Sequence, residues 1–126
     1  MAVTRFLHPN VQTAIHSDTD SENTAAAVEE SPVMVHSIDA DNASNGAASY
    51  VKFYDTLDTV VVGTTVPDHV FMIPASVRLV IESPDGLHFG AVCQVATVTA
   101  GGTGGTTSPT SSMILRLTYD PVEETE

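Results

Sequence analysis

Short segments of alternating apolar and polar residues, each bounded by turn-forming residues, dominate this chain from Val33 onward. The clearest is residues 49–55, where aromatic and β-branched side chains are concentrated. A period of two places successive side chains on opposite faces of a sheet, and this part of the chain has no convincing helical period. Further segments of this kind cover residues 33–39, 69–73, 77–82, 87–99 and 113–119. Six to eight such strands predict an all-β fold, a small antiparallel β-sandwich of jelly-roll or immunoglobulin-like order.

One internal turn is predicted with a specific mechanism. In Ser83-Pro84-Asp85-Gly86, proline presets φ and glycine accepts a positive φ, as a tight turn requires. This turn would separate the strand at residues 77–82 from a long strand at residues 87–99. The odd-numbered side chains of that long strand, from Leu87 to Val95, would share one apolar face.

A tract with almost no side-chain bulk precedes the last strand. Residues 97–112 consist of Gly, Thr and Ser with single Val, Ala and Pro residues, so they offer little apolar area to bury. We therefore expect a long exposed loop between the last two core strands, and we call residues 101–112 the Gly/Thr loop.

The chain divides by composition into an extended N-terminal arm (1–32), a β-sandwich domain (33–121) and a short acidic tail (122–126). Within the arm, Leu7, Val11 and Ile15 recur every four residues, which is the spacing of one helical face. We expect an arm that orders on a neighbouring subunit or partner, and the alternative is a frayed, solvated terminus. The candidate partner-binding residues are Phe6, Leu7, Val11 and Ile15.

The formal net charge is −12, and the fixed cations are only four: Arg5, Lys52, Arg78 and Arg116. Nucleic acid and anionic membranes are therefore not expected as partners, because both require clustered basic residues. No basic segment followed by an apolar one opens the chain, and no apolar run approaches the ~20 residues of a membrane span. These features predict a protein made in a cytoplasm.

Residue chemistry suited to catalysis or metal binding is sparse. The five histidines share no ligand spacing, and no Gly-x-Ser-x-Gly motif frames a serine. The Gly101–Gly105 cluster lacks the Gly-Lys-Ser/Thr ending of a phosphate loop. Cys93 is the only cysteine and lies in an apolar pattern, so we expect a buried, inert thiol. An irregular calcium site at the turn around Asp41 stays open as an alternative. We therefore expect neither an enzyme nor a bound cofactor, metal or small-molecule substrate.

The body of the chain resembles small β-sandwich virion structural proteins of tailed bacteriophages and prophages, including marine and cyanobacterial ones. The order of the segments is more specific than any single segment, and together they span residues 35 to 119. The segments are SYVKFYD (49–55), VGTTVPD (62–68), IPA (73–75), SPDGLHF (83–89) and the loop from Gly101 to Pro109.

This resemblance implies a capsid decoration, or cement, protein that binds and stabilises the shell from the capsid exterior, after synthesis in the host cytoplasm. Its expected partners are the major capsid protein and copies of itself, as a homotrimer. The alternative is a tail, fibre or baseplate component that contacts the host surface through the Gly/Thr loop. The resemblance transfers no functional residue.

Overall fold

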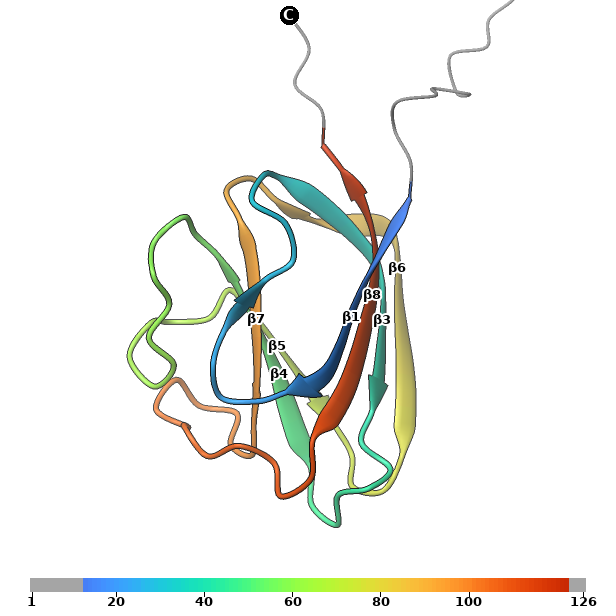
Figure 1. Ribbon diagram of the computed structural model, residues 1–126, viewed down its shortest axis with the longest axis vertical. Helices are drawn as coiled ribbons and strands as arrows, with labels where there is room; N and C mark the ends of the chain where they lie inside the picture. The colour runs from blue at the N-terminus through green and yellow to red at the C-terminus, as the bar shows by residue number, and fades with distance from the viewer. Residues whose placement is uncertain (1–12, 123–126) are drawn as a thin grey trace, which may run out of the picture.

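The computed structural model describes residues 13–122, and these form two antiparallel four-stranded sheets that pack face to face (Figure 1). The first sheet has the order β1-β8-β3-β6 and the second has the order β2-β7-β4-β5. The described residues contain no helix. The predicted all-β sandwich is therefore confirmed. The strands are β1 (Ala14–Ser21), β2 (Ala26–Ala27), β3 (Val33–Asp41), β4 (Ser49–Asp55), β5 (His69–Ile73), β6 (Arg78–Phe89), β7 (Cys93–Val98) and β8 (Met113–Pro121).

The strands pair as a nested set. β1 pairs with β8, β2 with β7, β3 with β6 and β4 with β5, all antiparallel. β3 with β8 and β4 with β7 complete the two sheets. An eight-stranded double sheet wrapped in this way is a jelly roll, which resolves the two alternatives left by the sequence.

The core lies between the sheets and is built by alternate residues of the central strands. Phe53 of β4 lies at its middle, with its ring centroid 5.7 Å from that of Phe71 and 5.8 Å from that of Phe89. The inward-facing residues of β3 and β8 close the core from the first sheet. They are Val33, Val35, Ile38, Ala40, Met113, Leu115, Leu117 and Tyr119.

The predicted boundary between an arm and the sandwich at residue 33 is wrong, because the sandwich already includes residues 14–27. β1 adds an edge strand beside β8, and β2 adds a short edge strand beside β7. The Ser21 and Thr97 hydroxyls form a buried 2.6 Å hydrogen bond at this point. An edge strand is held by backbone hydrogen bonds on one side, so a polar and acidic segment can serve as one. Residues 1–12 and 123–126 lie outside the described part of the chain.

The predicted tight turn at residues 83–86 is also corrected. The residues before and after it both pair with β3 and run in the same direction, so they belong to one strand, β6. Residues 83–86 form an excursion between Glu82, which pairs with Ser37, and Leu87, which pairs with Val35. Gly86 has the expected positive φ, at 81°.

The predicted strand at residues 87–99 is divided between the two sheets. β6 ends at Phe89, and β7 begins in the opposite sheet at Cys93. The Asp55 carboxylate holds the crossing, since it accepts hydrogen bonds from the backbone N–H groups of Gly90 (3.2 Å) and Ala91 (2.9 Å). Alternation continues through the crossing, so the sequence pattern did not reveal it.

A buried amide organises the end of the sandwich where β3 leads to β4. The Asn42 Nδ2 group donates hydrogen bonds to the carbonyl oxygens of Ala47, Ile73 and Pro74, at 3.0–3.3 Å. Its Oδ1 accepts hydrogen bonds from Asn45 (2.9 Å) and Ser49 (2.8 Å). Asn42 lies in the turn where a calcium site was left open as an alternative. Its amide joins the β3–β4 and β5–β6 connections.

Candidate docking surface

The last strands of the two sheets, β5 and β6, lie at the same side of the sandwich. Each has one edge that pairs with no other strand among residues 13–122. β5 has the sequence His-Val-Phe-Met-Ile and bears no charged side chain, so it lacks the lysines and prolines that commonly protect an edge strand. Its outward residues Val70 and Met72 are exposed. An uncharged edge of this kind is a template for pairing with another strand.

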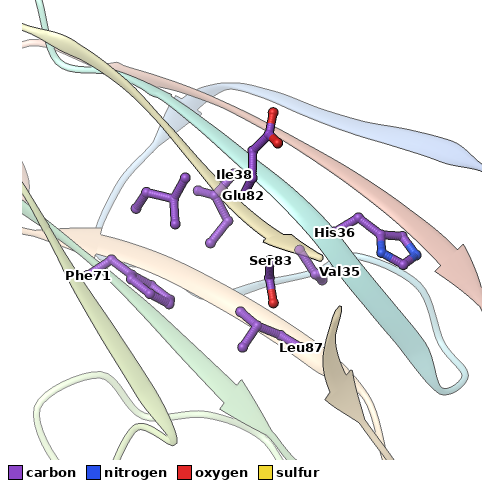
Figure 2. Close-up of a pocket in the computed structure, with 8 residues that line it drawn as sticks. Val35, His36, Ile38, Phe71, Glu82, Ser83 and Leu87 are labelled. Atoms are coloured by element: carbon purple, nitrogen blue, oxygen red, sulfur yellow. The ribbon is translucent and has the colours of Figure 1, made fainter. Parts of the chain in front are cut away.

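A cavity of about 200 Å³ opens between these two strands, where the excursion interrupts β6. Figure 2 shows side chains from β3, β5 and β6 around this space, with the Phe71 ring across from Leu87. The cavity lies at the excursion, where residues 83–86 of β6 do not pair with β3. The lining residues are Val35, His36, Ile38, Phe71, Ile81, Glu82, Ser83 and Leu87.

The chemistry of this cavity suits an apolar side chain. Its inner wall is formed by Val35, Ile38, Phe71 and Leu87, and Glu82 is exposed beside it. An apolar cavity of ~150 Å³ in a protein core can hold a benzene molecule, so this cavity has room for a phenyl ring or a branched aliphatic group. We call the cavity and the free edges of β5 and β6 the β5–β6 docking surface.

The imidazole of His36 does not serve this cavity. Figure 2 shows the ring turned away from the space, and its Nε2 lies 2.8 Å from Asp120 Oδ2. Thr13 donates a 2.7 Å hydrogen bond to the other carboxylate oxygen. This bond, with that of His36, lowers the pKa of Asp120. The pair joins β3 to β8, and Thr13 joins the start of β1 to both.

The Gly/Thr loop is packed against the protein on one side, which corrects the expectation of a wholly exposed connection. It lies beside the residue 56–68 connection on the side of the second sheet that faces away from the core (Figure 1). The Asn23 amide donates a 2.8 Å hydrogen bond to the Thr106 carbonyl, and Ser108 Oγ accepts one of 3.0 Å from the Asn23 backbone. Gly63 lies so close to Thr106 that a β-carbon there would overlap its methyl group. The two connections thus form one layer.

Lys52 is the buried cation beneath this layer. Its Nζ donates hydrogen bonds to the carbonyl oxygens of Gly102 (2.5 Å) and Gly105 (3.5 Å). No carboxylate of the described residues forms an ion pair with it, and burial lowers its pKa. Tyr54, also buried, has a hydroxyl without a hydrogen-bond partner, and burial raises its pKa. The Lys52 hydrogen bonds hold the loop from below, and neither Lys52 nor Tyr54 is exposed.

Two arginines lie on the outer face of the first sheet. Arg78 forms a two-point ion pair with Asp39, at 2.9 and 2.6 Å, and this hydrogen bonding lowers the pKa of Asp39. Arg116 pairs in register with Asp39 on the neighbouring strand. Cys93 is buried in the core, as expected, and desolvation raises its pKa to about 12.

Of the four residues predicted to bind a partner, the structure places one. Ile15 lies in β1 with 69% of its surface exposed, on the outer face of the first sheet, so its helical spacing with Val11 does not define a helix there. Phe6, Leu7 and Val11 lie outside the described residues. The β5–β6 docking surface was missed, although uncharged β5 and the Pro-Asp-Gly excursion were both visible in the sequence.

No family model, curated protein sequence or solved structure matches this chain. Within residues 13–122, no three His, Cys, Asp or Glu side chains are grouped as metal ligands. The same residues include no helix with the length and apolar character needed to cross a membrane.

Proposed function

We propose that this protein is a virion structural protein of a tailed bacteriophage, a decoration protein that binds the capsid exterior and stabilises the shell as a homotrimer. The observation that carries the proposal is the β5–β6 docking surface, in which the uncharged strand β5 borders an apolar cavity on an acidic molecule. A surface of this kind serves an assembly contact with another chain.

Two further features support this function. Jelly rolls recur among viral capsid proteins, although fold analogy alone does not establish a function. The net charge of −12 keeps copies apart in solution unless a specific contact holds them together, which suits a protein that assembles only at fixed positions. The segment order described above adds the resemblance to phage structural proteins.

The test uses undecorated capsids of the phage whose genome encodes this chain. Purified protein is added, the capsids are sedimented, and the bound copies and the capsid melting temperature are measured. We expect saturable binding in a fixed ratio to the major capsid protein and a higher melting temperature. Absence of binding, together with low copy number in mature virions, would contradict the proposal.

A matched pair of substitutions tests the docking surface in this assay. Met72→Lys places a charge on the edge strand β5, and Val61→Lys places one on the residue 56–68 connection, away from β5 and β6, at nearly equal exposure (52% and 55%). We expect Met72→Lys to reduce trimer formation and capsid occupancy, and Val61→Lys to leave both unchanged. Equal effects would exclude the β5 edge as the assembly contact.

A tail, fibre or baseplate role is the second candidate, and it is favoured by the layer that the Gly/Thr loop forms with residues 56–68. That layer exposes Leu57, Val61 and Val66 next to the small side chains of the loop. Host adsorption would then depend on these three residues while particle stability would not. Adsorption assays with a Leu57→Ser, Val61→Ser, Val66→Ser variant separate the two functions.

A further inference from the structure

We infer that the β5–β6 docking surface binds the N-terminal segment, residues 1–12, of a second copy of this chain, with Phe6 or Leu7 seated in the cavity. The inference deepens the proposed function and rests on it, since a decoration protein requires contacts between copies. The bound segment would cover a surface that the described sandwich leaves exposed.

The apolar residues of the segment fit the cavity. The cavity offers about 200 Å³ among the side chains of Val35, Ile38, Phe71 and Leu87. Residues 1–12 contain the adjacent pair Phe6-Leu7, and either side chain suits a space of that size. The free edge of β5 supplies backbone N–H and C=O groups, which an extended segment can pair with on both sides of an inserted anchor.

The charge of the segment complements the rim of the cavity. Residues 1–12 contain Arg5 and no acid, so all 16 acids of the chain lie in residues 13–126. The rim of the cavity carries Glu82, and the excursion beside it carries Asp85. An arm with Phe6 in the cavity therefore brings Arg5 to an acidic rim. The acid-free loops at residues 59–67 and 97–112 carry no cation to place there, so the charge complementarity favours residues 1–12 over these loops.

The opposite edges of the first sheet indicate that the segment comes from a second copy. β1, which residues 1–12 precede, is at the other edge of the first sheet from β6. A segment at one edge and a docking surface at the other give a head-to-tail contact between copies. Such a contact closes into a ring, as the proposed homotrimer requires.

Disulfide trapping between full-length chains tests the inference. Chains that carry Thr4→Cys, which keeps both Phe6 and Leu7, are mixed with chains that carry Ser83→Cys, a position that lines the cavity. The native Cys93 is buried and does not compete. The matched control replaces Ser83→Cys with Ala43→Cys, an exposed position in the β3–β4 connection. We expect the mixed disulfide to form about tenfold faster with the cavity position, because docking raises the local thiol concentration.

Two results would overturn the inference. Equal rates with the cavity and control positions would show that the segment does not dock there. In a chain carrying both Thr4→Cys and Ser83→Cys, a concentration-independent disulfide within one chain that forms faster than the one with Ala43→Cys would show that the segment binds its own cavity.

Self-association gives an independent measurement. Phe6→Ala with Leu7→Ala should weaken the self-association constant about 30-fold in sedimentation experiments, as loss of a central apolar anchor does. Val3→Ala in the same segment is the control and should have little effect. Unchanged association in the double variant contradicts the inference. Failure of the proposed function has a different signature, since cross-linking between purified chains would persist while capsids bind no protein.

Discussion

The Lys52 ammonium lies 2.5 Å from the carbonyl oxygen of Gly102, and this contact joins the most deeply buried cation of the described chain to its least bulky segment. Lys52 projects from β4 away from the core, where an exposed lysine would be expected. It is fully buried because the Gly/Thr loop covers it. Residues 101–105 of the loop are four glycines and one threonine, so backbone carbonyls rather than apolar side chains contact the lysine.

Lys52→Met should loosen the Gly/Thr loop with little cost in global stability. Methionine fills a similar volume and avoids the cost of burying a charge, which offsets the lost hydrogen bonds. We expect the free energy of unfolding to change by about 1 kcal/mol or less, while amide hydrogen exchange in residues 101–107 becomes faster. Arg116→Met removes an exposed cation and is the control. Unchanged exchange in the loop would contradict the assigned role.

The same residue should leave a signature in the pH dependence of stability. Burial lowers the Lys52 pKa below its usual value of 10.5, so between the lowered pKa and 10.5 the unfolded chain binds more protons than the folded one. The Lys52 contribution to stability therefore rises with pH in that window. Urea unfolding gives the free energy of unfolding of the native chain and of Lys52→Met at each pH. The difference between the two values should rise with pH in that window. A flat difference would mean that the burial has no effect on the ionisation of Lys52.

Tyr119 should contribute the opposite slope. Burial and a 2.7 Å hydrogen bond to Glu29 raise its pKa to about 12, so the folded chain retains a proton that the unfolded chain loses near pH 10. The contribution of Tyr119 to the free energy of unfolding is fully present below pH 10 and is lost as the pH rises toward 12. Tyr119→Phe should reduce the alkaline loss of stability. An unchanged alkaline limb would contradict this assignment.

Gly86→Ala should destabilise the protein by about 2 kcal/mol. Gly86 has a φ of 81°, and a β-carbon there would overlap the side chain of Met34. Gly46→Ala is the matched control, because a β-carbon at Gly46 meets no atom within 4 Å. Thermal unfolding of the two variants measures the difference. Equal melting temperatures would show that the excursion in β6 tolerates side chains.

Asn42→Ala should cost about 3 kcal/mol, because it leaves several buried polar groups without partners. Asn42 is fully buried and donates hydrogen bonds to Ala47 in the β3–β4 connection and to Ile73 and Pro74 where β5 leads to β6. The exposed neighbour Ser44→Ala should be nearly neutral. Chemical denaturation gives both values, and a near-neutral Asn42→Ala would show that water replaces the lost amide.

The fold class could be predicted from the sequence because the pattern of a half-buried strand is local. The alternation in residues 49–55 and 113–119 identifies β4 and β8 without reference to any partner. The polar residues of β1 give no such pattern, because an edge strand is fixed by its backbone pairing with β8 nearly 100 residues away. The excursion at residues 83–86 has the composition of a turn, and only the continued pairing of Leu87 with β3 shows that the strand resumes.

The candidate site was less predictable than the fold. The cavity at the β5–β6 docking surface combines Phe71 with Val35 and Leu87, which meet only when the two sheets pack. The sequence showed an uncharged strand at residues 69–73 but could not show that its outer edge is free.

The sequence by itself determined a small, acidic, all-β protein with a bulk-poor loop, because composition and period-two patterning are properties of neighbouring residues. Tertiary structure alone decided that the strands nest as a jelly roll, that residues 14–27 belong to it and that Lys52 is buried under the Gly/Thr loop. Each of these depends on contacts between residues that are not neighbours in the sequence, from 16 positions apart in the β4–β5 pair Phe53–His69 to 105 in the β1–β8 pair Ala14–Tyr119. Such contacts depend on which sheet edges and faces remain open once the other strands have paired.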